Sequence, residues 1–274
     1  MCYSGLKINM EINLNSIFYE IDKNNYKYLL SNDLRELKDI KSMDKDKFGL
    51  YEGITTLCFL SSEFSKYYFE VKKYLEYKEY KMVPLNTLHF TLLNLYCRSH
   101  YNLDIYNNII KNNYESFYKM CNLLKLKYPS FYESINESGF VYFGNNNNNN
   151  NNNNKILYEQ EKNEKIKFKI EDIFVGNTIK IILKSDIAIN NQLNKLKQKL
   201  KSTLLNDTLN DPKYYHITLA YRTNITSNTT DYKKLDEIKE MLEIILNKLE
   251  YIEFLPPCLC YFNSMSSYYP LYFS

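Results

Sequence analysis

The spacing of hydrophobic and polar residues changes repeatedly along the first half of the chain and predicts strands that alternate with helices. GITTLCFLS (53–61) is rich in β-branched and aromatic residues, which is typical of a strand. SEFSKYYFEVKKYLEY follows with apolar residues at helical spacing, and MVPLNTLHFTLLNLYC then indicates a strand introduced by Pro84. NLDIYNNIIKNNYESFYKMCNLLKL (102–126) predicts one long amphipathic helix.

The second half of the chain shows a similar order of elements. KIKFKIEDIFVGNTIKIILKSD predicts two strands with a turn at Gly176–Asn177, NNQLNKLKQKLKSTL predicts a helix, and YHITLAYRT predicts another strand. In YKKLDEIKEMLEIILNKLE the apolar residues step by three and four, as on one face of a helix: Leu235, Ile238, Leu242, Ile245 and Leu249. YIEFLPPCLCYF predicts a closing strand. The two halves are therefore alike at the level of elements.

Two segments depart from this pattern. Residues 1–45 are polar and mixed, with a helical pattern in NDLRELKDI, and we expect a partly helical leader before a domain that spans 46–274. Inside that domain, SGFVYFG predicts a strand that runs into ten consecutive asparagines, Asn145–Asn154. Such a tract cannot bury apolar surface, so we expect a disordered insertion at 145–154 in a loop that tolerates extra length.

Composition narrows the class of protein. A chain of 274 residues, 45% of them hydrophobic, is long enough for one large or two small globular domains. The net charge of +3 is too small to mark a dedicated nucleic-acid binder. MCYSGLKINMEINLN holds no continuous apolar stretch, and no run approaches the ~20 apolar residues of a membrane span. We expect a soluble, cytoplasmic protein without membrane contacts, with the nucleus as an open alternative.

The six cysteines are expected to be reduced thiols in the core. None forms a Cys-x-x-Cys pair, and none has a histidine at the spacing of zinc ligands. Cys258 and Cys260 share one face of the closing strand, and free cysteine is among the most buried residue types. The sequence thus predicts neither a bound metal nor another cofactor.

Two of the three histidines stand in the same tetrapeptide, His-x-Thr-Leu. HFTL begins at His89 and HITL begins at His216, each inside a predicted strand. Successive side chains of a strand point to opposite faces, so each histidine shares a face with Thr91 or Thr218. One neutral imidazole can accept a proton from an attacking hydroxyl, one imidazolium can donate to a leaving oxygen, and hydroxyls can bind phosphate oxygens. We expect the two strands to face each other across a cleft suited to phosphodiester chemistry.

Residues around the second motif are weaker candidates for the site. Tyr214 and Arg222 share the predicted face of His216 and are possible outer contacts to a base or a phosphate. Tyr215 and Tyr221 are expected on the opposite face, in the core.

The paired motifs resemble those of the 2H phosphoesterase superfamily, whose members carry two His-x-(Thr/Ser)-x motifs and include RNA 2′,3′-cyclic phosphodiesterases. The resemblance runs from Gly53 to the C-terminus, and GITTLCFL, PLNTLHFTL, YHITLAYRT and FNSMSSYYPL are similar to a little-characterised 2H-phosphodiesterase-like branch. It implies an α+β, bilobal fold in which two pseudo-symmetric small antiparallel sheets with outer helices surround a central cleft. It also implies that His89 and His216 are the catalytic base and acid, in either order, and that Thr91 and Thr218 bind phosphate.

The implied activity is that of a metal-independent phosphodiesterase. Its substrate would be an RNA end, a 2′,3′-cyclic phosphate or a cyclic nucleotide, and the sequence does not decide among these. Two alternatives stay open: a degenerate module that binds RNA or a nucleotide without turnover, and an interaction protein in which the motifs are ordinary strands. The third histidine, His100, lacks a partner pattern and is expected in an exposed loop. The oligomeric state is not defined by the sequence, and a monomer is the expectation.

Overall fold

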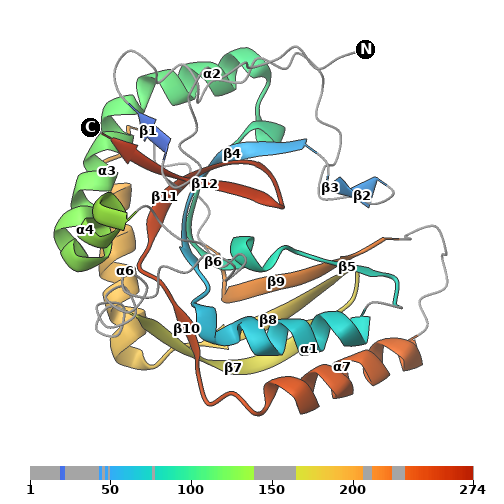
Figure 1. Cartoon of the computed structure of the whole chain (residues 1–274). Coiled ribbons are helices and arrows are strands. Elements are labelled where there is room, and N and C mark those ends of the chain that lie inside the picture. Colours follow the sequence, from blue (N-terminus) through green and yellow to red (C-terminus); the bar gives the residue numbers. More distant parts are fainter. Residues whose placement is uncertain are drawn as a thin grey trace.

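The chain forms two five-stranded sheets with helices packed against them, an α+β arrangement (Figure 1). The computed structural model describes residues 19–21, 43–44, 47–48, 50–75, 78–138, 165–205, 212–223 and 232–273. The first sheet has the strand order β1-β12-β11-β4-β6 and the second has the order β10-β7-β8-β9-β5. Neighbouring strands are antiparallel, except that β1 lies parallel to β12.

The strands of the first sheet are β1 (Tyr19–Ile21), β4 (Leu50–Phe59), β6 (His89–Cys97), β11 (Cys258–Ser264) and β12 (Ser267–Phe273). Those of the second sheet are β5 (Tyr80–Met82), β7 (Ile166–Val175), β8 (Thr178–Lys184), β9 (Tyr215–Arg222) and β10 (Ile252–Phe254). A separate short hairpin pairs β2 (Met43–Asp44) with β3 (Lys47–Phe48).

The two sheets exchange strands between the two halves of the sequence. The short strand β5, from the first half, pairs with β9 in the second sheet, and β11, from the end of the chain, pairs with β4 in the first. The predicted closing strand is therefore two strands in different sheets, and β12 follows it. The division falls at Pro256 and Pro257, between β10 and β11. Proline lacks a backbone N–H for a strand ladder and restricts the residue before it, so the strand ends there and the chain crosses to the other sheet.

The helices cover different sheets. They are α1 (Ser65–Leu75), α2 (Leu103–Asn112), α3 (Tyr114–Lys127), α4 (Pro129–Ser138), α6 (Ile187–Lys201) and α7 (Tyr232–Leu246). Helix α7 packs on β7 and against α1 below the second sheet, whereas α3 packs on β11 and β12 of the first (Figure 1). The predicted long helix is two helices because Asn113 interrupts it with a side-chain hydrogen bond to the Ile109 carbonyl, 3.0 Å away.

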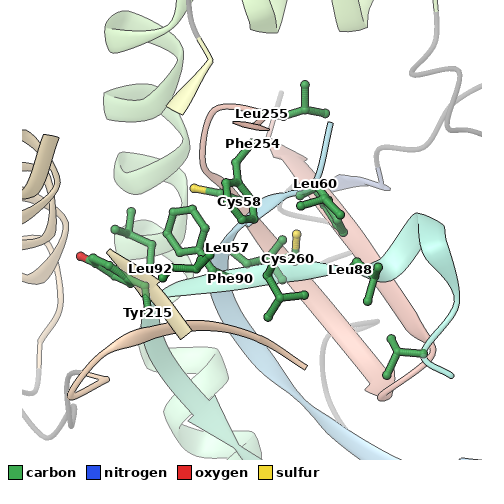
Figure 2. Close-up of a cluster of buried hydrophobic side chains, with 14 of the residues drawn as sticks. Leu57, Cys58, Leu60, Leu88, Phe90, Leu92, Tyr215, Phe254, Leu255 and Cys260 are labelled. Carbon is green, nitrogen blue, oxygen red and sulfur yellow. The ribbon is translucent and has the colours of Figure 1, made fainter. Parts of the chain in front are cut away.

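An apolar cluster joins the two sheets at the face of β6 that lies opposite its histidine (Figure 2). Phe90, the second residue of HFTL, is fully buried, and its ring centre lies 5.0 Å from Phe168, 5.1 Å from Tyr215 and 4.7 Å from Phe254. All three ring pairs are edge-to-face, which adds a favourable electrostatic term to the buried area. Truncating a buried Phe to Ala typically costs about 3–5 kcal/mol. The two motif strands are thus in contact through Phe90 of the first motif and Tyr215, which directly precedes the second.

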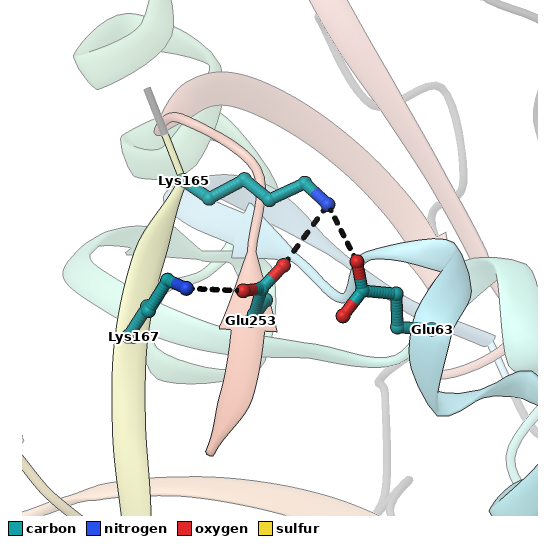
Figure 3. Close-up of polar contacts among 4 residues, drawn as sticks. All are labelled: Glu63, Lys165, Lys167 and Glu253. Carbon is teal, nitrogen blue, oxygen red and sulfur yellow. Dashed lines mark hydrogen bonds and ion pairs between the residues drawn. The ribbon is translucent and has the colours of Figure 1, made fainter. Parts of the chain in front are cut away.

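Lys165 links three elements near the start of β7 (Figure 3). Its ammonium lies 2.9 Å from Glu253 of β10 and 3.2 Å from Glu63 of the 3-10 turn η2 (Ser62–Phe64). Lys167 lies 2.7 Å from the other carboxylate oxygen of Glu253. Burial raises the pKa of Glu253, but the hydrogen bonds from Lys167 and Lys165 outweigh it, so the pKa lies below its usual value. This network fixes the edge strand β10 beside β7.

Several expectations from the sequence concern parts of the chain other than the two motifs. Cys258 and Cys260 are buried with their sulfurs 3.6 Å apart, and burial raises the pKa of the Cys260 thiol, as expected of inert core thiols. Of the predicted leader, Tyr19–Ile21 forms β1 beside β12, and NDLRELKDI lies outside the described residues. The asparagine tract at 145–154 and residues 139–144 of the strand expected at SGFVYFG also lie outside them, and Ser138 is the last residue of α4. No described helix is long and apolar enough to cross a membrane.

Candidate active site

A cavity of about 380 Å³ lies between the two sheets and brings the two motifs together. His89 and Thr91 line it from β6, and His216 and Thr218 line it from β9. All four side chains are half-buried. The two imidazoles are close enough that charge on His216 acts on the pKa of His89. The structure therefore collects the four motif residues on one concave surface.

Both histidines are oriented by the backbone in the same way. Nδ1 of His89 lies 2.6 Å from the carbonyl oxygen of Thr87, which belongs to the 3-10 turn η3 (Leu85–Thr87). Nδ1 of His216 lies 3.5 Å from the carbonyl oxygen of Tyr214, again two residues earlier. A carbonyl oxygen only accepts, so each Nδ1 carries a proton and donates it, the second bond being the weaker. In the neutral ring this leaves the Nε2 lone pair to accept a proton, and in the protonated ring Nε2 carries a proton that it can deliver.

The last residue of each His-x-Thr-Leu motif is a β-bulge. On β6 the pairing with β4 passes from Thr91 to Leu93 and skips Leu92. On β9 the pairing with β8 passes from Thr218 to Ala220 and skips Leu219. A bulge adds one residue to a strand and reverses the alternation of faces after it. The two motifs thus share a backbone irregularity as well as a sequence.

The bulges bring into the cavity the residue five positions after each histidine. Asn94 on β6 and Tyr221 on β9 both line the cavity. Tyr221 is buried, as expected, but the expectation that it faces away from His216 was wrong because simple alternation fails beyond Leu219. Burial raises the pKa of the Tyr221 hydroxyl, and a hydrogen bond with Thr218 opposes that shift. Tyr215 does lie in the apolar cluster, as expected.

The pKa of His89 is governed chiefly by burial. Removal from water disfavours the charged ring and is the largest effect, the hydrogen bond to the Thr87 carbonyl opposes it, and charge on His216 lowers the pKa further. The result is a pKa of about 4. His89 is therefore neutral near pH 7, with the lone pair of Nε2 ready to act as a base.

A row of aromatic rings leads along one wall of the cavity to His89. The ring of Tyr268 stands 4.4 Å from that of His89, Phe262 stands 5.5 Å from Tyr268, and Tyr51 stands 5.4 Å from Phe262. These rings come from β12, β11 and β4, and all line the cavity. Sequence patterns did not reveal this wall, because 28 tyrosines spread along the chain conceal the few that matter. Aromatic faces of this kind can stack a nucleobase.

The charge of the lining favours an anion. Among the described residues, Lys180 is the only lysine or arginine that lines the cavity, and no aspartate or glutamate lines it. His100, at the end of the 3-10 turn η4 (Arg98–His100), is exposed, as expected, and also lines the cavity. No group of three or more His, Cys, Asp or Glu side chains in the described part of the chain is placed to hold a metal ion.

The two outer candidates do not line the cavity. Tyr214 is exposed, and its ring stands 5.5 Å from that of His216, outside the lining. Arg222 lies three positions beyond the bulge at Leu219, and its guanidinium binds Glu79 at 2.9 Å and 3.2 Å. The sequence pattern placed Arg222 beside His216 because it did not include the bulge.

Comparison with known proteins supports the fold. The structure is similar to the crystal structure of a conserved protein of unknown function from Agrobacterium tumefaciens, with a TM-score of 0.50 and 14% sequence identity. The match covers 92% of this chain and 98% of that chain. No family model matches the sequence, and no curated protein matches it. At this identity the likeness concerns the fold alone.

Proposed function

We propose that this protein is a metal-independent phosphodiesterase of the 2H type, acting on RNA ends, 2′,3′-cyclic phosphates or cyclic nucleotides. The observation that carries the proposal is the meeting of His89, Thr91, His216 and Thr218 in one cavity. Each imidazole is oriented through Nδ1 and presents Nε2 for proton transfer. The absence of carboxylates from the described lining, together with Lys180, supports an anionic substrate.

His89 is the candidate base and His216 the candidate acid. For a 2′,3′-cyclic phosphate, Nε2 of His89 takes a proton from water as the water oxygen bonds to phosphorus. The bond from phosphorus to one ribose oxygen breaks, and protonated His216 gives its proton to that oxygen. One water is consumed, and the product is a phosphomonoester beside a free hydroxyl. The two histidines finish with exchanged protons, which solvent restores.

The threonines act on the phosphate rather than on the proton. In the transition state, negative charge builds on the non-bridging oxygens, and the hydroxyls of Thr91 and Thr218 can donate hydrogen bonds to them. Tyr221 orients the Thr218 hydroxyl through their shared hydrogen bond. The aromatic row beside His89 would hold the base of a nucleotide.

A substrate panel tests this proposal. The panel holds 2′,3′-cyclic nucleotides, 3′,5′-cyclic nucleotides, an ADP-ribose cyclic phosphate, and oligoribonucleotides with hydroxyl or cyclic phosphate ends, including a tRNA-splicing product. We expect turnover of at least one class in the presence of a chelator. The His216→Ala and His89→Ala variants serve as controls for a contaminating enzyme. Saturable binding without turnover of any class would instead support a nucleotide- or RNA-binding module.

A further inference from the structure

The two motif strands carry the same His-x-Thr pair, but the residues opposite the two threonines on the adjacent strands differ. On β8, Lys180 lies directly opposite Thr218 of the second motif. On β4, the residue opposite Thr91 of the first motif is Leu57, which is fully buried and does not line the cavity. Opposed residues of antiparallel strands have Cβ atoms about 4.5–5.5 Å apart and share a face. The cavity is therefore charged on the Thr218 side and not on the Thr91 side.

We propose that Lys180 is a catalytic residue that binds a non-bridging phosphate oxygen together with Thr218 and thereby sets the direction in which the phosphodiester lies. This inference rests on the proposed function. A phosphodiester carries one negative charge, and a second develops as the nucleophile adds, so a nearby ammonium stabilises the transition state more than the ground state. The charged oxygens then point to the second sheet, and the nucleoside lies along the aromatic row of the first.

The position of Lys180 supports this role over that of a solvated surface lysine. It is half-buried in the middle of β8, between β7 and β9, and its side chain lines the cavity. Lys184, at the end of the same strand, provides a contrast. It is exposed, does not line the cavity, and lies 3.8 Å from the exposed Glu171.

The test compares Lys180→Met, Lys180→Arg and Lys184→Met in the full chain, with a 2′,3′-cyclic nucleotide as substrate. Losing one transition-state donor typically lowers kcat by about 10²–10³-fold, so we expect about a 10²-fold fall in kcat for Lys180→Met with little change in KM. Lys180→Arg should recover most of the loss because it keeps the charge. Lys184→Met should match the wild type. A Lys180→Met variant that is folded and retains wild-type kcat would overturn the inference and leave the proposed function intact.

Double variants test the pairing with Thr218. If Lys180 and Thr218 bind the same oxygen, the combined loss in Lys180→Met/Thr218→Val should be smaller than the product of the single losses. In Lys180→Met/Thr91→Val the losses should multiply. The opposite pattern would contradict the assigned direction.

Binding of inorganic phosphate, measured by calorimetry, separates this inference from the proposed function. Inorganic phosphate at pH 8 is a dianion and so carries the second charge that the substrate phosphodiester gains only in the transition state. Lys180→Met should therefore weaken phosphate binding by about tenfold or more, and Lys184→Met should leave it unchanged. That result supports the anion site even if no substrate is turned over. Equal phosphate affinity in both variants would overturn it.

Discussion

At the scale of single residues, the two histidines of the cavity have different surroundings. His89 lies beside the ring of Tyr268 and donates a 2.6 Å hydrogen bond to the backbone, whereas the corresponding distance at His216 is 3.5 Å. Burial lowers the pKa of His89 to about 4, so its neutral form predominates over the physiological range. The near-symmetric pair can therefore divide the roles of base and acid.

This asymmetry predicts the pH dependence of kcat/KM. A base must be unprotonated to act, so the rate should rise with pH through the pKa of His89, about 4, and not through the usual imidazole value near ~6.5. The fall at higher pH should follow from loss of the proton that the acid delivers. The profile is measured from pH 3 to 9 in buffers of constant ionic strength. An acidic limb near ~6.5 that survives in His89→Ala would contradict the assignment of the base.

Removing the Tyr268 ring beside His89 should raise the pKa of His89. In Tyr268→Ala, water reaches the imidazole and desolvation falls, so we expect the pKa to move from about 4 toward the ordinary ~6.5. Tyr269→Ala is the control, because that ring stacks on Tyr261 and not on His89. The pKa of His89 in each variant is obtained by following the NMR chemical shifts of its ring protons as the pH changes. An unchanged or lower pKa in Tyr268→Ala would show that this ring does not exclude water.

At the scale of elements, the sequence predicts the motif strands, and the bulges determine what surrounds them. Period-two alternation placed His89 with Thr91 and His216 with Thr218, since nothing interrupts the strand between them. It failed beyond Leu219 because a bulge depends on pairing with a neighbouring strand, which the local sequence does not specify. The proline pair after β10 was visible in the sequence, but its effect, a crossing between sheets, required the partner strands.

The ion pairs of β10 predict how stability depends on pH. The pKa of Glu253 lies below its unfolded value, so its contribution is present above about pH 4 and is lost as the pH falls through the folded-state pKa. At pH 7, Glu253→Gln should lower the free energy of unfolding by about 2 kcal/mol, and the difference should shrink on acidification. Glu171→Gln, at an exposed pair, should cost about 0–1 kcal/mol. Denaturant unfolding at several pH values measures both. A Glu253→Gln deficit that grows in acid would contradict this account.

At the scale of the whole molecule, the cavity depends on sheets built from both ends of the chain. The first sheet needs β11 and β12, which follow the entire second half, and the second sheet needs β5, which precedes it. The order of elements predicted two similar halves, and the resemblance carried by the two motifs implied an α+β fold with two antiparallel sheets. The exchange of strands was not predicted, because it arises from pairings distant in sequence. The similarity to the Agrobacterium tumefaciens structure covers 92% of the chain, so it concerns this whole arrangement.

Strand exchange predicts that neither half folds alone. A fragment ending at residue 160 lacks β11 and β12, so β4 loses one of its two neighbours, and the complementary fragment lacks β5. Each should lack a cooperative thermal transition by circular dichroism, because half of the shared apolar cluster is missing. When the two fragments are expressed together, the cooperative thermal transition should return. Cooperative unfolding of either fragment by itself would show that the halves are independent domains.

The central claim, that the two histidines act as one catalytic unit on a phosphodiester, is tested most directly by the rates of single and double histidine variants. Hydrolysis of a 2′,3′-cyclic nucleotide, or of the best substrate in the panel, is measured for wild type, His89→Ala, His216→Ala and the double variant. We predict that each single substitution lowers the rate by at least about 10²-fold. The double variant should be about as slow as the slower single variant, since the effects of residues that act as a unit are strongly non-additive. Losses that simply multiply, or full activity in either single variant, would contradict the account.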